Sequence, residues 1–308
     1  MSRHHSVRSV QTLCAGFAFA GMLVLAAPEA SAQQTFKTPD EAAARLAEAA
    51  KSGYAKMVLM VLGRDAADIV SSGDEVSDKE TLERFTKAWD EKHSIKLEGD
   101  KKAVMILGND DFPFPIPLMK KKSVWEFDTA AGRQEILYRR IGRNELDAIQ
   151  TCLAFVDAQN EYAEKDRGQG AGVYAQRIVS TTGNKDGLYW PGDDSPLGEL
   201  AAQAAGEGYK VGEGPIPYHG YYFRVLTQQG PNAPGGTLSY VVKDKMIGGF
   251  ALLAWPAEYG NSGVMTFLVN HNGVVYQKDL GDSTAALVKR MNAFNPDQTW
   301  KQVDAAKP

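Results

Sequence analysis

The sequence predicts an α+β fold: N-terminal helices with a small antiparallel sheet, then a long helix packed on an antiparallel β-meander. Three observations predict this class. Apolar residues recur at helical spacing within residues 39–92, and again over a longer stretch within 145–164. Aromatic and β-branched runs separated by turn residues fill 221–278. Helices and strands therefore occupy separate stretches of the chain, as they do in α+β proteins.

The first 32 residues have the layout of a secretory signal peptide. Arg3 and Arg8 give a basic start, residues 13–27 are nearly all apolar, and residues 30–32 form the small-residue triplet Ala-Ser-Ala. The apolar run is about 15 residues, shorter than the roughly 20 that a membrane-spanning helix needs. We expect cleavage after Ala32 and a periplasmic or secreted protein. The alternative is a permanent N-terminal anchor.

Cleavage would leave 276 of the 308 residues. The chain would lose Arg3, Arg8 and Glu29, which takes the net charge from −4 to about −5. This acidic balance argues against nucleic acid and anionic lipid as partners. Cys152 would be the remaining cysteine, so we expect no disulfide within the chain and a buried, inert thiol. No later segment is apolar enough to span a membrane, so we expect no stable span after cleavage.

An N-terminal module is predicted over residues 33–142. A helix runs from Pro39 to about Leu62, with Thr38 as its N-cap in a capping box, and Gly53 is a point where it breaks in two. A second helix, 77–92, has Ser77 in a capping box and one apolar face formed by Leu82, Phe85, Ala88 and Trp89.

Strands complete this module. Residues 103–107 are a short apolar run, and residues 112–128 predict a hairpin that turns at Lys121-Lys122. The basic run 120–122 is expected to be a solvated turn that protects a sheet edge.

A C-terminal module is predicted over residues 143–308. It begins with a helix from Glu145 to Glu164, capped by Asn144, whose apolar stripe includes Leu146. A further helix is expected at 197–207. Strands are then expected at 221–226, 238–242, 247–255, 264–270 and 274–278. A closing helix is expected at 284–293. Asn272-Gly273 predicts a hairpin turn between the last two strands.

Four strings in the sequence resemble a known family. They are IGRNEL at 141–146, GLYWP at 187–191, GGFA at 248–251 and WPAEYG at 255–260. On these strings the chain is similar to the bacterial family catalogued as domain of unknown function 2950, and the resemblance covers nearly all of the cleaved chain. It implies an exported bacterial protein and transfers no catalytic residue.

A second resemblance concerns residues 143–280, which are similar to the globular part of type II secretion pseudopilins. The shared strings, with x for any residue, are AQxEY at 158–162, GYYF at 220–223, AxP at 254–256, GVMTF at 263–267 and NGV at 272–274. The chain has no prepilin cleavage motif, and its apolar leader is not fused to the pilin-type helix. The resemblance therefore implies a pilin-like fold and not filament assembly.

Glu258 is the candidate for catalysis. It follows a predicted strand and is flanked by Pro256, Tyr259 and Gly260, where a pocket could raise the pKa of its carboxyl group. The alternative is a turn carboxylate that accepts backbone amides. The adjacent residues 260–263, Gly-Asn-Ser-Gly, lack the spacing and context of a nucleophile elbow, so we expect a turn there.

Metal and cofactor sites are weakly indicated. The histidines of the cleaved chain (His93, His219 and His271) show no zinc-ligand spacing. Glu164 and Asp166 lie where a helix meets the glycine-rich loop 167–172, which makes them candidates for calcium, against the alternative of a solvated turn. The loop follows a helix and lacks Gly-Lys-Ser/Thr, so no nucleotide or other cofactor is expected.

Aromatic residues concentrate in the irregular region that precedes the meander, and they predict a binding surface. Such side chains stack on sugars and peptides, although core packing and loop pinning are the alternative. The residues are Tyr189, Trp190, Tyr218, Tyr221 and Tyr222.

Two functions are consistent with these observations. The first is a non-catalytic envelope protein that binds another protein or a cell-wall component through the aromatic surface. The second is a hydrolase acting on cell-wall or peptide material, with Glu258 as its candidate residue. Two carboxylates brought together in a cleft would favour the hydrolase, and an aromatic face without buried charge would favour the binding protein.

Overall fold

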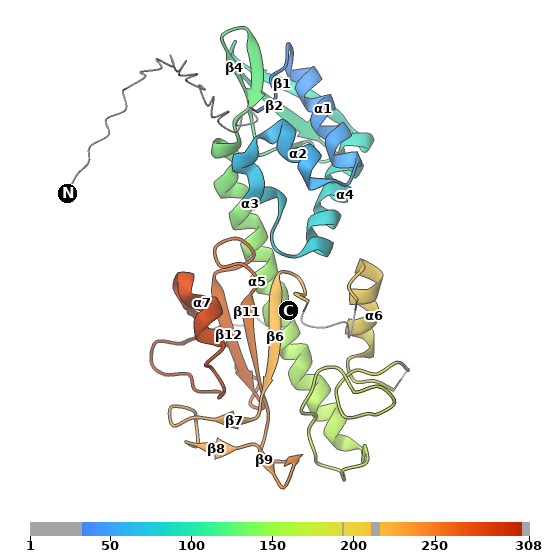
Figure 1. The fold of residues 1–308 in the computed structure, drawn as a ribbon, viewed down its shortest axis with the longest axis vertical. Coiled ribbons are helices and arrows are strands. Elements are labelled where there is room, and N and C mark those ends of the chain that lie inside the picture. Colours follow the sequence, from blue (N-terminus) through green and yellow to red (C-terminus); the bar gives the residue numbers. More distant parts are fainter. Residues whose placement is uncertain (1–32, 193, 211–215, 304–308) are drawn as a thin grey trace, which may run out of the picture. The chain divides into compact units, whose positions relative to one another are not determined.

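The computed structural model describes residues 33–192, 194–210 and 216–303, and Figure 1 shows their arrangement. The predicted signal peptide, residues 1–32, lies outside these residues. The described residues belong to one compact unit. No helix among them is long and apolar enough to cross a membrane.

Four helices and one 3-10 turn open the chain. Thr38 caps the first helix by accepting a hydrogen bond from the Glu41 backbone N–H, with Pro39 in the first turn. The predicted break is confirmed, because the helix stops before Gly53, whose φ of +70° suits glycine. The elements are α1 (Pro39–Lys51), α2 (Ala55–Leu62), η1 (Arg64–Ala66), α3 (Ala67–Val70) and α4 (Glu75–Glu91).

The start of α4 differs from the prediction. Asp74, not Ser77, is the N-cap, and its carboxylate accepts a hydrogen bond from the Ser77 backbone N–H at 3.1 Å. Ser77 therefore lies inside the first turn. The predicted apolar face of this helix packs, half-buried, against the N-terminal core as expected.

The N-terminal sheet is antiparallel, in the order β1-β2-β4-β5 with β3 also on β2. The predicted hairpin is confirmed for β4 and β5, which are joined through Lys122 with φ of +55°, whereas Phe112 and Pro113 pair with β2. Lys120 and Lys121 belong to β4, so the basic run 120–122 is not a turn as predicted, and only its last residue lies in the turn. Strand β1 was not predicted from the sequence, because its residues are mostly polar and exposed. The strands are β1 (His93–Glu98), β2 (Lys102–Leu107), β3 (Phe112–Pro113), β4 (Leu118–Lys121) and β5 (Val124–Phe127).

Helix α5 (Thr129–Glu164) is longer than predicted. Asp128 caps it by accepting from the Ala131 N–H, so Asn144 is not an N-cap but an internal residue whose amide donates to the Ser262 carbonyl at 2.9 Å. Gly132 lowers the helix propensity of this segment. The glycine is needed because a Cβ there would lie 2.7 Å from the Pro115 carbonyl oxygen. The predicted module boundary at residue 142 falls inside this helix and stays a prediction.

The apolar stripe of α5 also differs from the prediction by about one residue. Leu146 is 64% exposed, whereas Cys152 is fully buried, as expected, and Phe155 is 2% exposed. The buried side of the helix is centred on Cys152 and Phe155, and it lies against the C-terminal sheet.

The C-terminal sheet is antiparallel, in the order β14-β13-β12-β11-β6. Gly273, with φ of +72°, lies in the turn between β12 and β13, which confirms the predicted hairpin. The predicted strand 247–255 begins only at Ala251, because Gly249 has φ of +127°. The strands are β6 (Tyr221–Leu226), β11 (Ala251–Pro256), β12 (Met265–Asn270), β13 (Tyr276–Asp279) and β14 (Lys301–Gln302).

Shorter elements surround this sheet. Two small two-stranded sheets, β7-β8 and β9-β10, come between β6 and β11 in the sequence. The closing helix, α7, is shorter than predicted. These elements are α6 (Gly198–Glu207), β7 (Gln228–Gln229), β8 (Leu238–Ser239), β9 (Val241–Val242), β10 (Lys245–Met246), η2 (Gly281–Ser283) and α7 (Thr284–Val288).

Two hydrophobic clusters result. One joins α1 and α2 to the N-terminal sheet, and the other joins α5 to the C-terminal sheet. Helices and antiparallel sheets in separate stretches of the chain confirm the predicted α+β class.

Candidate functional site

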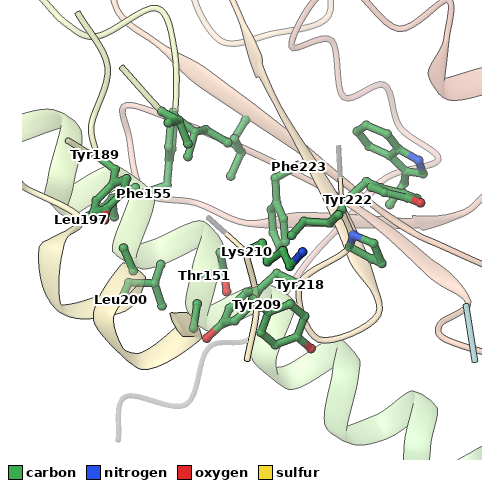
Figure 2. A pocket seen from close by; sticks show the side chains of 18 residues that line it. Thr151, Phe155, Tyr189, Leu197, Leu200, Tyr209, Lys210, Tyr218, Tyr222 and Phe223 are labelled. Carbon is green, nitrogen blue, oxygen red and sulfur yellow. The ribbon is translucent and has the colours of Figure 1, made fainter. Parts of the chain in front are cut away.

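An apolar cavity of about 300 Å³ lies between helices and the C-terminal sheet (Figure 2). Helix α5 contributes Thr151 and Phe155, α6 contributes Leu200, and β6 contributes Tyr222 and Phe223. A volume of this size, lined mostly by apolar and aromatic side chains, is typical of sites for small molecules or single side chains.

Three of the five predicted aromatic residues line this cavity: Tyr189, Tyr218 and Tyr222. The other two belong to the core. Tyr221 is fully buried, and its hydroxyl donates to the Met265 carbonyl at 2.9 Å. Trp190 is 5% exposed, and its indole N–H donates to the Asp194 carboxylate. Side chains alternate in direction along an extended segment, which separates each of these from its neighbour.

A second, polar cavity of about 240 Å³ adjoins the first. The two share Thr151, Leu200 and Tyr218 as lining residues. Asp147 and His219 supply the charged groups of the second cavity. One side of the combined site is therefore apolar and the other can form hydrogen bonds.

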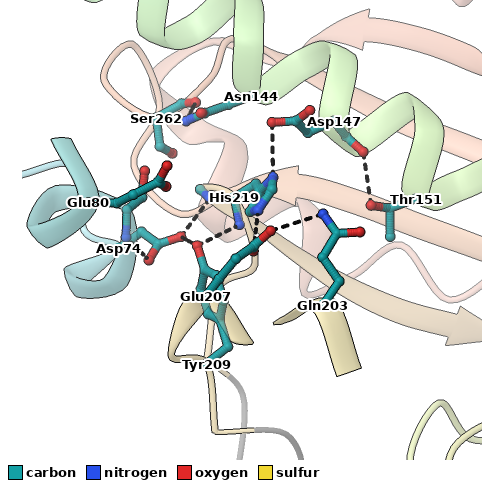
Figure 3. A network of polar contacts seen from close by, with 12 residues as sticks. Asp74, Glu80, Asn144, Asp147, Thr151, Gln203, Glu207, Tyr209, His219 and Ser262 are labelled. Carbon is teal, nitrogen blue, oxygen red and sulfur yellow. Dashed lines mark hydrogen bonds and ion pairs between the residues drawn. The ribbon is translucent and has the colours of Figure 1, made fainter. Parts of the chain in front are cut away.

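His219 is held between two carboxylates (Figure 3). Its Nδ1 lies 2.9 Å from Asp147 Oδ2, and its Nε2 lies 2.8 Å from Glu207 Oε2. Burial favours the neutral ring, but the hydrogen bonds to Asp147 and Glu207 outweigh it and raise the pKa of His219 to about 9. At neutral pH the imidazolium therefore links α5 to the C-terminal end of α6.

A buried carboxylate fixes the backbone beside His219. Asp74 is 2% exposed, and its Oδ2 accepts from the Tyr209 hydroxyl and from the Gly220 N–H, each at 2.8 Å. The Tyr209 hydroxyl in turn accepts from the His219 N–H at 3.2 Å. Burial and the adjacent Asp74 raise the pKa of Tyr209, which keeps its phenol protonated as a donor. Asp74 thus joins the start of α4 to the start of β6.

Glu258 lies in the turn after β11 and is exposed. Its carboxylate accepts from the Asn261 amide at 2.8 Å, and its carbonyl accepts from the Asn261 and Ser262 N–H groups. Asn261 also accepts from buried Arg140, which donates to the Asp68 and Ile69 carbonyls as well. Residues 260–263 form a turn, as expected, and Glu258 lies away from both cavities.

The candidate calcium residues lie at the end of α5. Asp166 Oδ1 accepts from the backbone N–H groups of Gly168 and Gly170, at 2.8 and 2.7 Å. These bonds, that from Gly170 first, lower the pKa of Asp166. Glu164 is exposed. Within the described residues, no three His, Cys, Asp or Glu side chains gather as a metal site.

The sequence did not predict Asp147, Glu207 or His219 as residues of the site. His219 has no candidate partner nearby in the sequence, because Asp147 and Glu207 lie 72 and 12 residues away. The one local feature in the sequence is the His219-Gly220 pair, and in the structure His219 has φ of +48°, a conformation in which histidine is enriched.

The family described as protein of unknown function (DUF2950) matches residues 33–303. The chain belongs to this family. The DUF2950 match spans both hydrophobic clusters and all residues that line the two cavities. No curated protein and no solved structure matches the chain. The likeness to the globular part of pseudopilins, and with it the pilin-like arrangement, stays a prediction.

Proposed function

We propose that this DUF2950 chain is an exported, non-catalytic binding protein whose ligand, a partner protein or a cell-wall component, occupies the apolar cavity. The observation that carries the proposal is the cavity of about 300 Å³ that Tyr189, Tyr218 and Tyr222 line. Tyrosine provides a large contact area at a low cost in side-chain entropy, which favours its use in binding surfaces. The polar cavity beside it supplies the hydrogen-bonding groups that orient a ligand.

The alternative, a hydrolase, receives partial support from Asp147 and Glu207, which come from different elements and meet at His219. Both ring nitrogens of His219 are hydrogen-bonded to carboxylates, and its pKa of about 9 keeps it protonated at neutral pH. A protonated imidazole has no lone pair with which to activate a nucleophile. The cluster is therefore better suited to holding α6 in place than to general base catalysis.

Export is the second part of the proposal. It is supported by the basic, apolar and small-residue segments of residues 1–32. The mass of the native polypeptide tests it: a chain that begins at Gln33 supports export with cleavage, and a chain that retains residues 1–32 contradicts it.

Photocrosslinking in intact cells tests the binding site. A photoreactive phenylalanine analogue replaces Tyr222 in one strain and Tyr138, an exposed residue of α5, in another. We expect a light-dependent adduct, identified by mass spectrometry, from position 222 and not from 138.

A matched pair of variants assigns that adduct to the cavity. Ala201→Phe fills the cavity from α6, whereas Ala202→Phe places the same side chain on the exposed side of that helix. We expect the adduct to disappear in the first variant only. Equal adducts from positions 222 and 138, or cleavage of wall fragments by the purified protein, would contradict the proposed function.

A further inference from the structure

Strand β6 forms one edge of the C-terminal sheet along all six of its residues. It pairs with β11 on one side, from Tyr221 opposite Pro256 to Leu226 opposite Ala251. Just before the strand, the Ala257 N–H donates to the Gly220 carbonyl at 2.9 Å, which makes this a hydrogen-bonded pair.

The direction of each backbone group in β6 follows from that pair. Hydrogen-bonded and non-hydrogen-bonded pairs alternate along an antiparallel ladder. Tyr222, Arg224 and Leu226 therefore bond to β11. Phe223 and Val225 direct their N–H and C=O groups away from β11, toward the outer edge.

These outward groups have no partner within the described part of the chain. Tyr221, which also faces outward, is paired with Tyr218 through two hydrogen bonds of 2.8 and 3.1 Å. No backbone or side-chain group among residues 33–192, 194–210 and 216–303 bonds the outward N–H or C=O of Phe223 or Val225. Among the described residues, two donors and two acceptors at strand spacing are thus unpaired.

The apolar cavity surrounds this open edge. Tyr222 and Phe223 are consecutive in β6 and point to opposite faces of the sheet, yet both line the cavity. Leu252 and Trp255 of β11 also point to opposite faces, and both line it too. The cavity therefore reaches both faces around the edge of β6.

We propose that an extended peptide segment of a partner protein adds to β6 as a sixth strand and places alternate side chains in the apolar cavity. This inference rests on the proposed function and names the class of ligand. Strand addition supplies affinity through main-chain hydrogen bonds and specificity through pockets for alternate side chains. Sugars and acyl chains lack N–H and C=O groups at strand spacing, so a peptide is the complementary ligand.

Peptides selected from a phage-displayed library of random twelve-residue sequences test the proposal. The selected peptide is synthesised and added to the purified protein, and backbone amide exchange is followed by NMR. We expect exchange at Phe223 and Val225 to slow by at least about tenfold, with little change at Tyr222 and Arg224. In a series of peptides that each carry one N-methylated residue, we expect loss of binding when the methylated amide faces β6. Amides that face β6 alternate along the peptide, so every second position in the series should be sensitive.

Two variants of β6 provide the matched control. Val225→Pro removes an outward N–H without removing a bond to β11, and Val225→Ala shortens the same side chain but keeps the N–H. We expect at least about a tenfold loss of peptide affinity in the first and less than about threefold in the second.

The outcomes separate this inference from the proposed function. A peptide that changes Trp255 fluorescence but leaves exchange at Phe223 and Val225 unchanged overturns strand addition and leaves the cavity as a binding site. Failure to select any peptide that Ala201→Phe weakens overturns strand addition, whereas the proposed function fails only if the adduct from position 222 is absent or persists in Ala201→Phe. If Phe223 and Val225 are already protected at high protein concentration, and truncation after Val303 exposes them, the tail of a second copy is the occupant and the proposal is wrong.

Discussion

The two edges of the C-terminal sheet differ in length, chemistry and surroundings. Strand β14 has two exposed residues, Lys301 and Gln302, and pairs only with Tyr276 and Gln277. Strand β6 has six residues, begins with three aromatic residues, and borders the apolar cavity. Natural proteins protect sheet edges by keeping them short or charged, and β14 follows that rule.

Strand β6 does not follow the rule. Its one charged residue, Arg224, is turned inward, where its guanidinium donates to the Val288 and Met291 carbonyls and stacks over Trp255. By contrast, the outer strand β1 of the N-terminal sheet carries Lys96 and Glu98. Strand β6 therefore lacks both the short length and the exposed charge that protect the other edges, which is consistent with the proposed strand addition.

The largest effect is expected for Gly220→Ala, at the start of β6. Gly220 has φ of +76°, and a Cβ there would lie 2.5 Å from Asn144 Nδ2, whose amide bonds Ser262. Backbone strain, overpacking and a lost buried hydrogen bond together cost about 4 kcal/mol of unfolding free energy. Urea denaturation measures it.

Gly206→Ala in α6 is the control for that substitution. A Cβ at Gly206 meets no atom within 4 Å, and the helix gains up to about 1 kcal/mol from alanine. If both variants lose stability equally, the conformation of Gly220 in the turn before β6 does not explain the loss in Gly220→Ala.

An intermediate and pH-dependent effect is expected for His219→Gln. The pKa of His219 is raised from 6.5 to about 9 in the folded chain, so the folded state binds the proton more tightly than the unfolded state. The resulting stabilisation is complete below about pH 6.5 and is lost as the pH rises through 9. It amounts to at most about 3 kcal/mol, and partial exposure of the ring reduces it.

Urea denaturation of the native protein and His219→Gln at pH 6 and pH 10 measures this difference. In Asp147→Asn, which removes one of the two carboxylates, the stabilisation should be lost at a lower pH. A difference that stays constant between pH 6 and pH 10 would show that the ion pairs do not hold His219.

The smallest effect is the expected difference in stability between two variants that each place a proline in β6. Tyr222→Pro and Phe223→Pro each remove one half-buried aromatic ring, but only Tyr222 donates its N–H to β11. Tyr222→Pro should therefore be less stable by about 1 to 2 kcal/mol. Thermal denaturation of the two variants measures the difference, and a less stable Phe223→Pro would reverse the assigned directions.

Local signals in the sequence predicted the elements that local chemistry determines. Thr38 and Pro39 mark the start of α1, and Asn272-Gly273 marks a hairpin, because caps and turns depend on adjacent residues. The first half of α5 was missed because Gly132 looks unfavourable in a helix until Pro115 is seen packed against it. Tertiary contact, not propensity, decides that segment.

The candidate site could be predicted only in part. A concentration of aromatic residues identified Tyr189, Tyr218 and Tyr222, but the direction of each side chain depends on strand pairing, which placed Tyr221 in the core. The cluster at His219 depends on three elements that meet only in the folded chain. The sequence contains no pattern that joins residues so far apart.

Amide exchange in the free protein tests most directly whether β6 is an open edge beside the cavity. NMR measures it residue by residue along Tyr222, Phe223, Arg224 and Val225. We predict slow exchange at Tyr222 and Arg224, which bond to β11, and fast exchange at Phe223 and Val225. Equal protection at all four amides would contradict it, because the outer edge would then already be covered.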